Sequence, residues 1–95
     1  MTQNPFAVTV RLMWIDDVID EEGQIQRSDI MRAFRISPAQ ASLELRRYQS
    51  LNPDRIGYDC SAKCYMAIEG TRPLFTRGHR SAAADIVRAV SEHYP

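Results

Sequence analysis

Apolar residues recur at helical spacing along residues 5–22, and they cover more than one face of the helix that they predict. One stripe runs from Val8 to Ile19 at intervals of four, three and four residues. Trp14 and Val18 lie outside that stripe, on the remaining circumference. A helix that is apolar this far round is buried on two sides. One of the two sides is expected to rest on the helices that follow.

Residues 28–51 contain two helical patterns separated by a very short connection. Ser28 is the predicted cap of the first helix, which ends before Ser37-Pro38. Pro38 disfavours helical backbone at the residue before it and is well tolerated as the first residue of a new helix. Ser37 and Gln40, three residues apart, predict a capping box. Helices joined so closely must cross at a steep angle, which predicts a helix-turn-helix.

The second of these helices has two unlike faces. At helical spacing, Ala41, Leu45 and Tyr48 share one stripe, and Glu44 lies at its margin. The opposite face carries Arg, Gln, Ser and small side chains, whereas a solvated face normally mixes both signs of charge. We expect the apolar stripe to face the core and the Arg/Gln side to face outward. The alternative is an ordinary amphipathic core helix whose surface is basic.

The remaining sequence predicts a hairpin and a last helix. Two β-prone runs flank the turn at 60–63 and predict a hairpin over 55–68. After a loop, Ser81 is the predicted cap of a helix over 81–93. A hairpin directly after a helix-turn-helix is a wing. The predicted fold is α+β: one winged helix-turn-helix domain over 1–95, with a three-helix core, a β-hairpin wing and an additional C-terminal helix.

The surplus of apolar helix surface predicts self-association. Trp14 and Val18 on the first helix, with Ile86 and Val90 on the last, are the candidate dimer contacts. Aromatic anchors are enriched at such interfaces, which favours Trp14 in particular. The sequence leaves open the alternative that the hairpin or the C-terminal helix covers the second face of the first helix.

The chain has no net charge, but its charges are unevenly distributed. Residues 1–26 hold Arg11 against five acidic residues, whereas residues 27–80 hold ten basic residues against five acidic ones. Eleven of the twelve cations are Arg, the side chain better suited to bidentate binding of phosphate and bases. The basic middle of the chain is the pattern expected of a phosphate-contacting surface.

These features together predict contacts to double-stranded DNA. The helix that begins at Ser37 would enter the major groove, where Arg pairs with guanine and Gln with adenine. The predicted base contacts are Gln40, Ser42 and Arg46, and the predicted sites of close apolar approach are Ala39 and Leu43. The predicted phosphate contacts are Arg27, Arg47, Arg55 and Lys63.

Cysteine and histidine add little to this interpretation. Cys60 and Cys64 straddle the hairpin turn, so a thiol switch on the wing is one hypothesis. Zinc needs four ligands, and neither the cysteine spacing nor His79 and His93 match such a pattern. We therefore expect no metal.

Other functional classes find no support in the sequence. It contains no Gly-rich phosphate loop, nucleophile elbow or paired catalytic carboxylates. The acidic residues at 16–22 are interpreted as a solvated helix end. No apolar run is long enough to span a bilayer, and the N-terminal residues do not form a secretory signal. We expect a cytoplasmic protein with no cofactor, no membrane partner, no identifiable small-molecule effector and no enzymatic activity.

The run over 23–65 resembles the N-terminal winged helix-turn-helix of bacterial WYL-domain transcription regulators, most closely the CapW/BrxR type. The similar residues are a Gly-x-Ile-x-Arg lead-in, a recognition helix and a wing: Gly23, Ile25, Arg27, Ile36, Ser37, Gln40, Ala41, Ser42, Leu45, Tyr48, Tyr58, Asp59, Ser61, Ala62, Lys63 and Tyr65. The resemblance implies a homodimeric repressor of phage-defence operons that reads an inverted repeat. The chain stops near where that family's ligand-sensing WYL domain would begin, so effector sensing is not carried over. A stand-alone relative and an excised domain are both compatible with this.

Two functional hypotheses follow. The first is a sequence-specific DNA-binding transcriptional regulator, acting as a homodimeric repressor. The second is a protein-interaction adaptor or inhibitor module that uses the same fold, which the zero net charge and the surplus of apolar helix faces favour.

Overall fold

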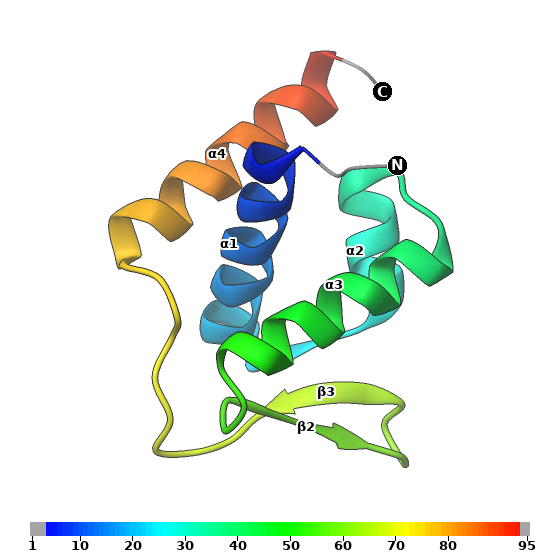
Figure 1. Ribbon diagram of the computed structural model, residues 1–95, viewed down its shortest axis with the longest axis vertical. Helices are drawn as coiled ribbons and strands as arrows, with labels where there is room; N and C mark the ends of the chain where they lie inside the picture. The colour runs from blue at the N-terminus through cyan, green and yellow to red at the C-terminus, as the bar shows by residue number, and fades with distance from the viewer. Residues whose placement is uncertain (1–3, 94–95) are drawn as a thin grey trace.

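The computed structural model describes residues 4–93, which form four helices and a three-stranded sheet (Figure 1). The helices are α1 (Pro5–Glu22), α2 (Arg27–Phe34), α3 (Pro38–Leu51) and α4 (Arg77–His93), and the strands are β1 (Gln24–Ile25), β2 (Ile56–Asp59) and β3 (Cys64–Ala67). This arrangement confirms the predicted α+β winged helix-turn-helix with an additional C-terminal helix. None of the helices in the described range is long and apolar enough to cross a membrane.

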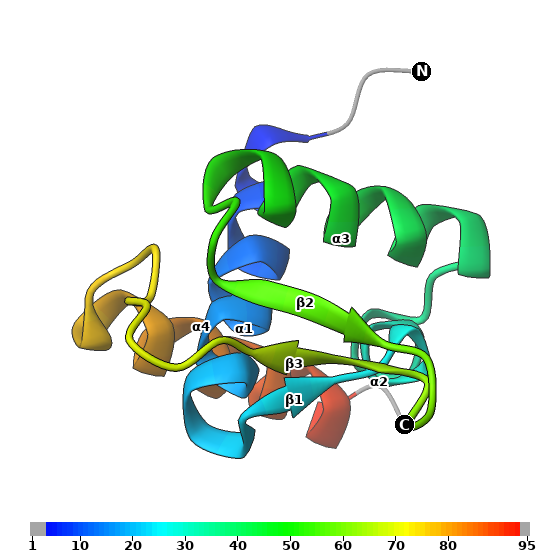
Figure 2. The same cartoon turned by 90° about the horizontal axis from the view of Figure 1, so that it is seen from below.

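The wing is larger than the predicted hairpin because β1 joins it. The sheet is antiparallel in the order β1-β3-β2, with Ile25 paired to Tyr65 and Tyr58 paired to Tyr65 on the other side (Figure 2). Gly23, at φ +76°, ends α1 with a hydrogen bond from its N–H to the carbonyl of Ile19. The strand that follows leads directly into α2, so the base of the wing is held between the first two helices.

The core lies between α1, α2, α3 and the inner face of the sheet. Its completely buried side chains come from all four elements, and they include Ile15, Ile19, Ile25, Ile30 and Tyr48. The predicted inner stripe of α3 is confirmed, since Ala41, Leu45 and Tyr48 are all buried. The periodicity of that helix therefore gave the correct orientation.

Two predicted helix caps are wrong. The cap of α2 is Gln26, two residues before Ser28, because Gln26 and Asp29 form a capping box with each other's backbone. Ser28 instead donates to the side-chain oxygen of Gln26 at 3.3 Å. Helix α4 begins at Arg77, where the hydroxyl of Thr76 accepts from the N–H of His79 at 3.2 Å, and Ser81 lies inside the helix.

Helix α4 packs across α1 (Figure 1). Of the alternatives left open by the sequence, the C-terminal helix covers the second face of the first helix. Trp14 is correspondingly half-buried, and its ring packs edge-on against Phe34 with 5.4 Å between the ring centroids. Val18 is half-buried beside it.

The acidic end of α1 is solvated at Asp20, Glu21 and Glu22, but the prediction is wrong for Asp16. Asp16 is completely buried and accepts hydrogen bonds from the hydroxyl of Tyr48 and from the N–H groups of Leu74 and Phe75. A buried carboxylate is stable only when such donors replace water. The side chain of Asp16 thereby joins α1, α3 and the loop before α4.

Burial shifts two pKa values in this region. Burial and the hydrogen bond to Asp16 raise the pKa of Tyr48 above its ordinary value of 10.0. Burial also raises the pKa of Asp17, an effect that the nearby charge of Arg80 opposes. Arg80 is itself buried and lies 2.8 Å from a carboxylate oxygen of Asp20.

Candidate nucleic-acid interface

The start of α3 is built as its sequence predicts. Ser37 has extended backbone, and its hydroxyl accepts from the N–H of Gln40 at 3.1 Å. Pro38 follows as the first helical residue. The capping box is one-sided, because within residues 4–93 the Gln40 side chain makes no bond back to Ser37. The first turn of the helix is nevertheless fixed, with Ser37 and Ala39 exposed.

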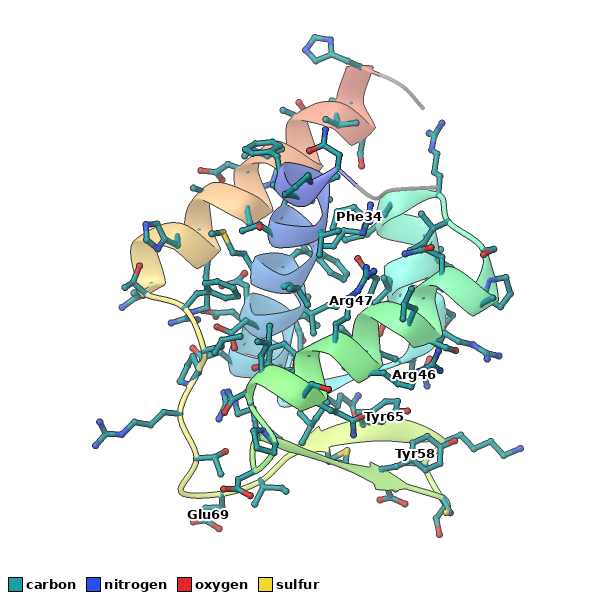
Figure 3. The ribbon with its side chains drawn as sticks, in the orientation of Figure 1. Phe34, Arg46, Arg47, Tyr58, Tyr65 and Glu69 are labelled. Carbon is teal, nitrogen blue, oxygen red and sulfur yellow. The ribbon has the colours of Figure 1, made fainter. Side chains whose placement is uncertain are left out.

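The outward side of α3 carries Arg46. Arg46 is exposed, whereas Ser42 and Leu43 are half-buried at the edges of the same side. Figure 3 shows Arg46 on the side of α3 nearer to the sheet and Arg47 on the side that faces α1 and α2. The two adjacent arginines therefore differ in their surroundings.

Arg47 belongs to a buried ion cluster. Glu44 is completely buried, and its two carboxylate oxygens pair with Arg47 in the same helix and with Arg11 of α1. A buried carboxylate with two guanidinium partners is a structural arrangement. The predicted phosphate contact of Arg47 would therefore have to compete with Glu44.

Arg55 is a second predicted phosphate contact, and the structure contradicts it. Its side chain is 7% exposed, pairs with Asp20 at 3.2 Å and donates to the carbonyl of Thr71 at 3.1 Å. The sequence did not reveal this, because the partners Asp20 and Thr71 are 35 and 16 residues away from Arg55. It holds the base of the wing against α1 and does not face solvent.

Gln40 is not presented as the prediction requires. The residue is half-buried, and its side-chain nitrogen Nε2 is covered and has no hydrogen-bond partner within residues 4–93. Pairing with adenine uses that nitrogen as the donor. In this conformation the side chain does not offer it.

Arg27 and Lys63 lie at a groove between the helix-turn-helix and the wing. The groove has a volume of about 680 Å³ and receives residues from α2, α3 and the wing. Arg27 lies 3.4 Å from the hydroxyl of Ser42, and Lys63 is exposed in the wing turn with φ +55°. These three predicted contacts are thus brought together, although they are far apart in the chain.

Sequence reasoning missed Tyr58, which lines the same groove. The residue is 54% exposed, and its ring packs edge-on against Tyr65, with 5.0 Å between the ring centroids. The alternation of side chains along a strand was the available signal, because a position paired with Tyr65 must share its face of the sheet.

The two cysteines are in different environments. Cys60 is exposed in the wing turn, whereas Cys64 is buried, and both are free thiols. The Cys64 sulfur lies 3.4 Å from the sulfur of Met66 and 3.7 Å from the side-chain oxygen of Gln24. A thiol switch between the two cysteines stays a prediction without structural support.

The four predicted dimer residues line two adjoining surface hollows along α1 and α4. Ile86 and Val90 line one hollow, Trp14 and Val18 line the other, and Val87 borders both. Ile86 and Val90 are exposed, and Phe6 at the start of α1 is also exposed beside them. We name this surface the α1–α4 seam, defined by Phe6, Trp14, Val18, Ile86, Val87 and Val90.

The sequence has known relatives. A family model of the BrxR transcriptional regulator winged helix-turn-helix domain matches residues 7–89. Proteins named DNA-binding transcriptional repressor CapW are similar to this chain. Those from Stenotrophomonas maltophilia and Escherichia coli (strain KTE188) are each 40% identical, over 67 and 65 residues, and one from Pseudomonas aeruginosa is 38% identical over 65 residues.

These alignments cover 70%, 68% and 68% of this chain, in the same order, but only 22% of each relative. The chain therefore spans 22% of the length of the relatives that it matches. The family model, in contrast, extends from α1 into α4 and includes the whole helix-turn-helix and the wing. On this match, the chain belongs to the family of BrxR transcriptional regulator winged helix-turn-helix domains.

Proposed function

We propose that this chain is the sequence-specific DNA-binding domain of a transcriptional repressor, acting in the cytoplasm as a homodimer on an inverted repeat. The observation that carries the proposal is the exposed outer side of α3 beside the groove that holds Arg27 and Lys63. An exposed arginine on a capped helix is suited to bidentate pairing with guanine. The cations beside it are suited to the flanking phosphates.

The proposed contact set is smaller than the set that the sequence predicted. Arg46 and Ser42 read bases, Ala39 and Leu43 allow close apolar approach, and Arg27 and Lys63 bind phosphate. The start of the helix at Ser37 lies against the backbone of the DNA. Arg55, Arg47 and Gln40 are left out because their polar groups are paired or covered within the domain.

The α1–α4 seam supports the homodimer. Val90 is 51% exposed and Phe6 is 68% exposed, and the hollow that they border has a volume of about 260 Å³. Apolar side chains gathered on one surface typically mark an interface. The seam belongs to α1 and α4, so its use as an interface would leave α3 and the wing uncovered.

Selection of bound duplexes from a random pool tests the proposal. We expect recovery of a pseudo-palindrome whose half-sites are about one helical turn apart, roughly 34 Å. Binding of the recovered duplex should weaken steeply with salt. Recovery of no preferred sequence, together with no binding at low salt, would contradict the proposal.

A second candidate is a protein-interaction adaptor that uses the same fold. The exposed seam residues Phe6, Ile86 and Val90 and the zero net charge are the observations that favour it. Sedimentation measures the oligomeric state of Val90→Asp, with Ser81→Asp on the same helix as the control. It distinguishes a seam that forms a homodimer from a seam that binds another protein. A homodimer predicts that only Val90→Asp becomes monomeric, whereas a wild-type chain that is monomeric at every concentration would favour the adaptor.

A further inference from the structure

The groove between the recognition helix and the wing has one sign of charge. Arg27 and Ser28 at the start of α2, Ser42 on α3 and Lys63 in the wing turn all line it. No carboxylate lines it within the described range 4–93. Two cations without an opposing acid make a site for an anion.

The floor of the groove on the wing side is aromatic. Tyr65 packs against the core, and Tyr58, directly opposite it in the sheet, rests edge-on against its ring. Figure 3 shows Tyr65 between the sheet and α3 and Tyr58 further toward the tip of the wing. Because Tyr65 supports its ring, Tyr58 is held in place although more than half of its surface is exposed.

The hydroxyl group of Tyr58 is an unused donor. It makes no hydrogen bond within residues 4–93, whereas Tyr48, the buried tyrosine of α3, donates to Asp16. An aromatic ring with a free hydroxyl suits a ligand that has an apolar part and an acceptor side by side. A nucleotide sugar followed by its phosphate has both.

We propose that this groove binds one segment of the DNA backbone, with Tyr58 as a specific phosphate contact. The ring of Tyr58 lies against a deoxyribose, its hydroxyl donates to a phosphate oxygen, and Arg27 and Lys63 neutralise the charge. This inference rests on the proposed DNA-binding function and adds a residue to it. The contact fixes the position of α3 in the major groove and does not read a base.

A neutral donor and a cation leave different signatures in a salt titration. Replacing Arg27 or Lys63 by alanine removes a counterion-releasing contact, so the slope of log affinity against log salt should fall by about 1. Tyr58→Phe removes only a hydroxyl group. It should lower affinity by about tenfold at every salt concentration while the slope stays unchanged.

The decisive experiment pairs this variant with a change in the DNA. Single phosphates of a duplex selected by the wild-type protein are replaced, one at a time, by neutral methylphosphonates. At one position the replacement should weaken binding by the wild-type protein. On that modified duplex, Tyr58→Phe should lower the affinity little further. Met66→Ala changes the opposite face of the same sheet and is the matched control, with no expected loss.

The outcomes separate this inference from the proposed function. If the wild-type protein binds no duplex, the DNA-binding function itself is wrong. If the wild type binds and Tyr58→Phe binds equally well, or its loss is the same at every methylphosphonate position, the assignment of Tyr58 is wrong. Matching thermal melts of the folded variants rule out loss of structure as the cause.

Discussion

Cationic side chains lie in two regions of the molecule: the interior between α1, α3 and α4, and the outer surface formed by α3 and the wing. In the interior, each of these cations pairs with a carboxylate. Glu44, Asp16 and Asp20 receive the interior guanidinium groups. On the outer surface, Arg46 and Lys63 form no ion pair within residues 4–93. Cationic side chains therefore stabilise the fold in the interior, whereas on the outer surface Arg46 and Lys63 have no carboxylate partner within residues 4–93.

This difference explains how a chain of zero net charge can have a cationic face. Within the described range, six of the twelve cations have a carboxylate partner: Arg11, Arg32, Arg47, Arg55, Arg80 and Arg88. Most of the acidic residues of α1 take part in these ion pairs. A charge sum along the sequence counts paired and free arginines alike, so it overstates how much of the basic middle is available to DNA.

Among substitutions that remove an interior ion pair, a change at Glu44 should lower stability the most. Glu44→Ala leaves Arg11 and Arg47 beside each other without their carboxylate, and we expect the free energy of unfolding to fall by about 3–5 kcal/mol. Chemical denaturation measures it. Glu69→Ala, an exposed glutamate in the loop before α4, is the control and should change stability by less than about 0.5 kcal/mol. Equal stability of the two variants would show that the cluster is not structural.

A smaller effect is expected at the hydrogen bond between Tyr48 and Asp16. Tyr48→Phe removes a donor to a buried carboxylate, which should cost about 1.5–3 kcal/mol at neutral pH. The folded-state pKa of Tyr48 is raised above its ordinary value of 10.0, so its contribution is fully present below that pH. The contribution is lost as the pH rises further.

Unfolding free energies at pH 7 and pH 11 test this. The unfolding free energy of the wild type should fall between pH 7 and pH 11, so the difference in unfolding free energy between the wild type and Tyr48→Phe should become smaller. A gap that stays constant up to pH 11 would contradict the assignment of the raised pKa to this pair.

The smallest effect on stability is expected at Arg55. Its partner Asp20 is partly exposed and also pairs with Arg80, so Arg55→Ala should cost only about 1–2 kcal/mol. Denaturation measures this loss, and the salt dependence of DNA binding by the folded fraction should be unchanged. A reduced salt slope would restore Arg55 to the phosphate contacts that the sequence predicted.

Local patterns in the sequence were sufficient for the scaffold. Ser37-Pro38 placed the start of α3, and the spacing of Ala41, Leu45 and Tyr48 gave its orientation. Each of these inferences uses residues within about three turns of one another, where helical geometry alone decides which side chains share a face.

The charge partners that are far apart in the sequence were not predictable in this way. Asp16 and Tyr48 are 32 residues apart, and Arg55 and Asp20 are 35 apart, so no local pattern connects them. A run of acidic residues at a helix end looks solvated unless the arginines that fold back onto it are known. Arg47 differs, because its partner Glu44 is three residues earlier in the same helix, so helical spacing could have distinguished it from Arg46, which forms no ion pair within residues 4–93.

Binding of a selected duplex by Arg46→Ala and Arg55→Ala, compared at equal concentrations of folded protein, tests the division between the two regions most directly. We expect Arg46→Ala to weaken binding by about 1–3 kcal/mol and to relax the preference at one base pair, because an exposed side chain that reads a base is lost. Arg55→Ala should bind as tightly as the wild type. The reverse order, with Arg46→Ala unchanged and Arg55→Ala weakened, would contradict the account.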